Sequence, residues 1–101
     1  MKIHLFKIKK GKLNKWLLWG KTLETKYRKK AIETLKEEGL DYEAFYVFKV
    51  KEDYYTIATL IGEAKPANMK RKINIEHKKN KKEALKYIGN VDKVYELTTK
   101  G

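Results

Sequence analysis

The sequence contains no cysteine, which excludes disulfide bridges, thiolate zinc sites and cysteine nucleophiles. It has no apolar run approaching the roughly 20 residues that a membrane-spanning helix requires. The apolar stretch near the N-terminus, Ile3 to Phe6, is too short for a signal peptide and is followed at once by lysines. We therefore expect a cytoplasmic protein with no membrane partner.

Arginine is scarce, although the chain is strongly basic. Only Arg28 and Arg71 accompany 23 lysines, and the formal net charge is +12. Residues 1–15 carry +6 and residues 65–82 carry +7, so these two segments hold the whole excess. Such segments are typical of nucleic-acid contacts, but phosphate recognition favours the planar guanidinium of arginine. A solvated lysine-rich surface is the favoured interpretation. The alternative is phosphate-backbone binding by Lys70, Arg71, Lys72, Lys78, Lys79, Lys81 and Lys82.

The composition predicts a single domain over residues 1–101. Hydrophobic residues make up 42% of the chain, which supplies a core for a domain of this length. Residues 2–9 alternate between polar and apolar side chains, as in a strand. From Lys12 onwards, apolar side chains recur at steps of three and four residues until Gly39. This pattern predicts one helix of about 27 residues, with any bend at Gly20.

The second half of the chain predicts three more strands and one helix. Residues 41–50 and 54–61 are rich in aromatic and β-branched side chains, so we expect an antiparallel hairpin. A weaker helical stripe covers 69–88, and 91–98 form the last expected strand. The order βαββαβ predicts an α+β, ferredoxin-like plait with a four-stranded antiparallel sheet and two helices on one face.

The expected strands carry apolar side chains on both faces. In 41–50, Tyr46 and Phe48 lie on one face, whereas Phe45 and Val47 lie on the other. Helices on one face leave the second face uncovered, and an uncovered apolar patch usually marks an interface. The sequence therefore predicts a homodimer in which two sheets pack about a two-fold axis.

Three short features carry a resemblance to a known family: Trp16, the stretch Ala31-x-x-Thr34-Leu35-x-x-Glu38-Gly39-x-x-x-Glu43-x-Phe45, and the segment Ile73-x-x-Glu76-His77. Together they resemble a domain family of unknown function. That family is related to the dimeric α/β-barrel superfamily, which includes antibiotic-biosynthesis-type monooxygenases. The likeness covers about residues 2–98 and implies a dimer whose sheets form a barrel, with no established reaction. Of the residues typical of haem-degrading relatives, only His77 has a counterpart, so we expect no cofactor.

His77 and Glu43 are the candidate catalytic residues. His77 lies on the apolar helical stripe and should point into the cleft between helix and sheet, where an imidazole can act as acid, base or ligand. Glu43 lies on a mostly apolar strand and is a plausible partner for it. Trp16, Trp19 one turn further on and Tyr27 beyond it are the expected walls for a flat apolar ligand. Each residue also has a simpler structural explanation, as a packed histidine, a strand-end salt bridge or core aromatics.

Two candidate ligands are too few for a metal site, so we expect none. The favoured function is binding or transformation of a small organic molecule in the helix–sheet cleft of a dimer. The residues do not decide between binding and catalysis. A basic nucleic-acid-binding module is the alternative function.

Overall fold

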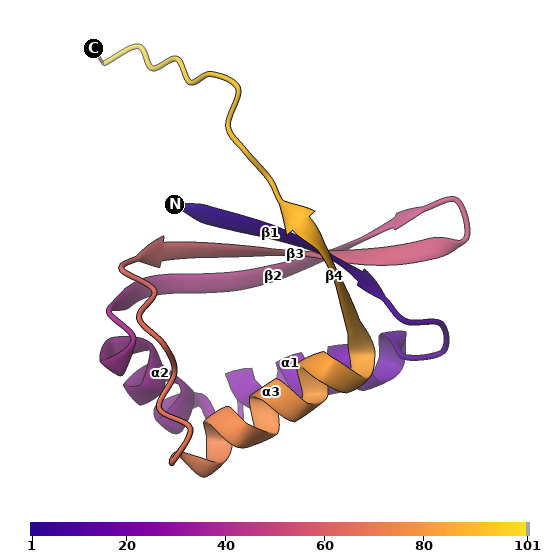
Figure 1. Cartoon of the computed structure of the whole chain (residues 1–101), viewed down its shortest axis with the longest axis vertical. Helices are drawn as coiled ribbons and strands as arrows, with labels where there is room; N and C mark the ends of the chain where they lie inside the picture. The colour runs from indigo at the N-terminus through magenta and orange to yellow at the C-terminus, as the bar shows by residue number, and fades with distance from the viewer. Residues whose placement is uncertain (101) are drawn as a thin grey trace.

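The computed structural model describes residues 1–100 and contains one four-stranded antiparallel sheet and three helices (Figure 1). Strand β1 (Lys2–Ile8) lies inside the sheet, between β3 (Asp53–Gly62) and β4 (Leu85–Asn90). Strand β2 (Leu40–Val50) forms the other edge, so that the order is β2-β3-β1-β4. Every neighbouring pair is antiparallel. The predicted α+β class and four-stranded antiparallel sheet are therefore confirmed.

Helices α1 (Leu13–Glu24), α2 (Arg28–Glu37) and α3 (Lys72–Ala84) lie on one side of the sheet (Figure 1). The buried core is small and combines the two tryptophans of α1 with residues at the β1–α1 and α3–β4 junctions. Its members are Ile8, Trp16, Trp19, Ala84 and Leu85. Because this core is concentrated at one end of the helical layer, it leaves space between α2 and the sheet.

The single helix predicted before Gly39 is interrupted between α1 and α2, and Gly20 causes no break. The hydroxyls of Thr22 and Thr25 each donate to the carbonyl four residues earlier, at 2.8 and 2.7 Å. Such bonds weaken the local helix. The amide of Tyr27 then donates to the carbonyl of Thr22 at 3.0 Å, one residue beyond its α-helical partner. Gly39 ends α2 with a φ of 69°, as the sequence predicts.

The prediction for the last elements is wrong in its boundaries. The helix expected over 69–88 ends at Ala84, and the strand expected over 91–98 is not formed. Instead, β4 begins at Leu85, which is buried and pairs with Ile8 of β1. Pairing with the free edge of β1 decides the strand here, and a helical period in the sequence cannot indicate which edge is free.

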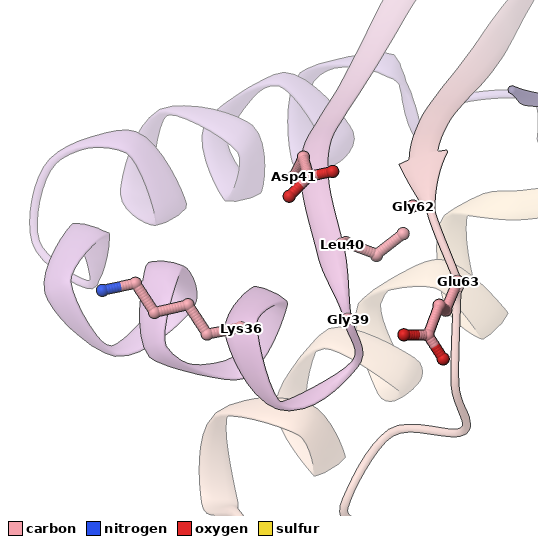
Figure 2. Close-up of a pocket in the computed structure, with 6 residues that line it drawn as sticks. All are labelled: Lys36, Gly39, Leu40, Asp41, Gly62 and Glu63. Atoms are coloured by element: carbon pink, nitrogen blue, oxygen red, sulfur yellow. The ribbon is translucent and has the colours of Figure 1, made fainter.

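The joint between α2 and the hairpin depends on a close approach of two glycines. Gly62 ends β3 with a φ of 127°, and a Cβ atom there would lie 2.3 Å from the carbonyl oxygen of Gly39. The amide of Glu63 donates to that same carbonyl at 2.9 Å. Figure 2 shows the two segments side by side at this point. Only glycine fits at position 62, and the contact fixes where β2 starts relative to α2.

The sheet surface opposite the helices, here called the open face, is apolar. Within residues 1–100 no helix or strand covers it (Figure 1). In the β2–β3 pairing, the side chains of the open face lie on the opposite side of the sheet from Phe45, which packs against the core. Large apolar side chains on it are between 39% and 52% exposed, namely Tyr42, Tyr46, Phe48, Val50 and Ile61. Both sides of β2 therefore carry apolar residues.

Candidate functional site

A cleft of about 1210 Å³ lies between the sheet and the helices. Its walls come from α1, α2, α3 and the inner side of β2, with the segment after β3 at its rim. The residues that matter for its chemistry are Trp16, Trp19, Glu38, Glu43, Phe45, His77 and Lys81. The cleft is large enough for a small organic molecule.

Three aromatic rings surround His77 of α3. The rings of Trp16 and Trp19 lie nearly parallel to the imidazole, with centroids 6.5 and 6.1 Å from it. Phe45 of β2 meets it edge-on at 6.4 Å. The spacing of the tryptophans, three residues apart on α1, places both indoles on the helix face that meets α3. The imidazole is therefore held between rings and cannot rotate freely.

The hydrogen bond to His77 fixes its tautomer. Trp19 Nε1–H donates to His77 Nδ1 at 2.8 Å. Because an indole only donates, Nδ1 must be unprotonated, and the neutral ring carries its proton on Nε2. Burial lowers the pKa of His77 to about 4, and the positive charge of Lys81 acts in the same direction. At neutral pH, His77 is thus a hydrogen-bond donor through Nε2–H, and not a base.

Glu43 of β2 presents a carboxyl group to the same cleft. Within residues 1–100, the carboxyl group of Glu43 forms no hydrogen bond and no ion pair with another side chain. Burial raises its pKa, and the nearby charge of Lys81 opposes this rise. The pKa of Glu38, at the end of α2, is also raised, first by burial and then by the negative charge of Glu43. The cleft therefore holds a desolvated carboxyl group without a partner.

The structure brings four of the five predicted site residues to one cleft: Trp16, Trp19, Glu43 and His77. Glu43 and His77 share the cleft without a hydrogen bond between them. Tyr27 is placed behind the wall, where its ring packs against Trp19 with centroids 6.2 Å apart. Tyr27 therefore supports an indole of the cleft instead of lining it.

Sequence reasoning missed Phe45, Glu38 and Lys81 as parts of the site. It also did not predict the hydrogen bond from Trp19 to His77, because the two residues are 58 positions apart. Lys81 was read only as part of a basic segment. It lies instead at the cleft, with its Nζ 5.5 Å from the centre of the Phe6 ring.

The seven residues of the nucleic-acid alternative do not form one free surface. Arg71 is bound to the carboxylates of Glu37 and Glu33 at 2.5 and 3.4 Å. Lys81 and Lys78 border the cleft. The remaining four are exposed, namely Lys70, Lys72, Lys79 and Lys82.

A second, shallower pocket of about 530 Å³ lies at the glycine joint (Figure 2). Asp41 and Glu63 border it, and the side chain of Lys36 extends away from both. Among residues 1–100, no group of three or more His, Asp or Glu side chains is placed to hold a metal ion. This pocket supplies no set of ligands.

Over residues 1–100, no helix is long and apolar enough to cross a membrane. The predicted relationship to the dimeric α/β-barrel superfamily has no independent support and stays a prediction. No family model, no curated protein sequence and no solved structure matches this chain.

Proposed function

We propose that the protein binds a small, flat organic molecule that carries a hydroxyl group, and that the helix–sheet cleft is its site. The observation that carries this proposal is that Glu43 and His77 line the same cleft. One is a desolvated carboxyl group without a partner, and the other is a fixed N–H donor between aromatic rings. A hydroxyl group can donate to the carboxylate and accept from Nε2–H at the same time.

The aromatic walls favour a flat body for the ligand. The rings of Trp16 and Phe45 meet edge to face, with an interplanar angle of 72° and centroids 5.2 Å apart. A planar ring can stack on one and meet the other edge-on. Burial raises the pKa of Glu43, so this carboxyl group is the one in the site that we propose to exchange a proton with the ligand. Proton transfer to or from the ligand at Glu43 is therefore the chemistry we propose.

We propose that the fold which holds the site is a ferredoxin-like plait, and that it dimerises through the open face. The order β2-β3-β1-β4 supports this plait, because β1 and β3 lie inside the sheet and each crossover carries its helices on one side. The third helix arises because α1 and α2 divide one crossover. The exposed aromatic residues of the open face support a partner sheet, and relationship to the dimeric α/β barrels belongs to the same proposal.

Calorimetric titration with 2-naphthol tests the binding site. We expect saturable binding that strengthens as the pH rises through the raised pKa of Glu43, because the carboxylate accepts the hydroxyl proton. Glu43→Gln should weaken binding at least about tenfold, which corresponds to about 1.4 kcal/mol. The matched control is Glu52→Gln in the exposed turn after β2, which should leave the affinity unchanged. Equal affinities of the two variants would show that 2-naphthol binds elsewhere.

Nucleic-acid binding is the second candidate function, and one contact favours it. Lys9 Nζ donates to the carbonyl of Lys82 at 2.8 Å, so the two basic segments of the chain meet at one end of the molecule. Binding to a single-stranded RNA of mixed sequence should then weaken steeply with salt, in proportion to the phosphates contacted. No retention on this RNA at low salt would exclude the candidate.

A further inference from the structure

The C-terminal segment, residues 91–98, leaves the domain without packing on it and is here called the tail. The amide of Val91 donates to the carbonyl of Ile3 at 2.8 Å, which is the last backbone bond between tail and sheet within residues 1–100. Beyond it, no strand or helix forms. Figure 1 shows the tail rising on the side of the sheet opposite the helices. The tail and the open face therefore lie on the same side of the molecule.

The tail carries large apolar side chains with almost no cover. Val94 is 92% exposed, Tyr95 is 77% exposed and Leu97 is 86% exposed. Scattered single apolar residues on a surface need no explanation, but three large apolar side chains within four positions of one uncovered segment are a concentration that does. The open face is the other large apolar surface on that side, and the tail of the same protomer does not cover it.

We propose that the tail clasps a second copy of the chain and lies along the partner copy's β2. This inference rests on the proposed dimer and adds a second contact to it. Seven extended residues span about 23 Å, whereas packed sheets are about 10 Å apart, so the tail is long enough to cross to the partner. It reaches the partner only if the two open faces meet.

Strand β2 is the edge that fits the tail best. It stands at the end of the sheet, so its outer backbone groups have no strand neighbour among residues 1–100. It also carries exposed apolar residues on both sides, including Tyr46, Val47 and Phe48. An extended peptide that adds to such an edge gains backbone hydrogen bonds and apolar contacts together. The other edge strand, β4, has only six residues, and the tail begins directly after it.

Sedimentation equilibrium on the full chain gives the first test. The triple variant Val94→Ser/Tyr95→Ser/Leu97→Ser should raise the dimer dissociation constant at least about tenfold. The matched control changes three neighbouring polar residues, as Lys93→Ser/Glu96→Ser/Thr99→Ser, and should leave the constant unchanged. At a concentration at which all three proteins are monomeric, circular dichroism of both variants should match that of the original chain, because residues 94–97 pack on nothing within their own protomer. A dimer with the same constant in all three proteins would overturn the clasp and leave the proposed dimer intact.

Photo-crosslinking locates the tail in the unaltered fold. A chain with a benzoylphenylalanine at position 95 is mixed with a ¹⁵N-labelled chain, irradiated and digested. We expect adducts between the unlabelled tail and a ¹⁵N-labelled peptide containing residues 40–50. Adducts confined to unlabelled peptides would show that the tail folds back on its own protomer. A monomer in the sedimentation experiment would show that the proposed dimer itself is wrong. Both results overturn the inference.

Discussion

Replacing His77 by glutamine should remove a pH dependence of folding that the structure assigns to one buried imidazole. His77 is held between two indoles and accepts the Trp19 indole proton at Nδ1. Its folded-state pKa is about 4, because burial and the charge of Lys81 disfavour the imidazolium ion. In the unfolded chain the same ring titrates near its ordinary pKa of about 6.5. The unfolded state therefore binds a proton in a range of pH in which the folded state does not.

The sign and size of the effect follow from this difference. Stability rises with pH wherever the unfolded state binds more protons. The contribution of His77 is therefore complete above about pH 6.5 and is lost as the pH falls towards 4. The separation of the two pKa values corresponds to roughly 3 kcal/mol in the free energy of unfolding. Glu43 and Glu38, with raised pKa values, act in the opposite direction. They are present in both proteins and cancel in the comparison.

Guanidinium unfolding at pH 7.5 and at pH 4.5 measures this quantity. Relative to His77→Gln, the original chain should lose most of the 3 kcal/mol between the two conditions. His4→Gln, which alters the only other histidine, retains His77 and should retain this loss. A difference between the original chain and His77→Gln that does not change with pH would refute the buried, neutral imidazole.

Three further substitutions test other parts of the structure. Trp19→Phe removes the donor to His77, so the ring should populate both neutral tautomers in ¹⁵N NMR spectra, with a loss of about 1 kcal/mol in stability. Thr56→Val should raise the free energy of unfolding by about 1 kcal/mol, because the Thr56 hydroxyl is buried without a hydrogen-bond partner within residues 1–100. Gly62→Ala should cost roughly 2–3 kcal/mol in thermal unfolding, because its Cβ would meet the carbonyl of Gly39 at 2.3 Å.

Two matched controls separate these causes from general effects of substitution. Thr59→Val removes a hydroxyl that donates to the carbonyl of Ala44 at 3.2 Å, so it should not stabilise the chain as Thr56→Val does. Gly20→Ala places a Cβ where no atom lies within 4 Å, in the interior of α1. It should stabilise the chain by up to about 1 kcal/mol. A loss of stability in Gly20→Ala would show that α1 is not a regular helix there.

The β2–β3 hairpin was predictable because the residue types within each strand determine it. Aromatic and β-branched residues dominate both strands, and the expected 41–50 and 54–61 differ by one residue at the ends from β2 and β3. The last strand was not predictable in the same way. Leu85 can continue the helical stripe or start a strand, and only its pairing with the distant Ile8 of β1 decides between them.

In the candidate site, too, features set by neighbouring residues were predictable, and features set by contacts between distant residues were not. The inward-facing positions of Trp16 and His77 followed from helical periodicity, whereas Glu43 was only a plausible partner for His77; all three line one cleft. The role of His77 could not be predicted, because the proton on its ring depends on an indole from a helix 58 residues earlier. Tyr27 was expected at the ligand, but the turn between α1 and α2 places its ring behind Trp19.

A titration of the ¹⁵N-labelled indole groups with 2-naphthol tests the proposed cleft most directly. The chain has two tryptophans, both lie at the cleft, and each gives one indole signal. Saturable shifts of both signals, weakened by Glu43→Gln and unchanged by Glu52→Gln, are the expected result. Unmoved indole signals at a concentration of 2-naphthol that shifts the amide signals of the open face would contradict a ligand site between helices and sheet.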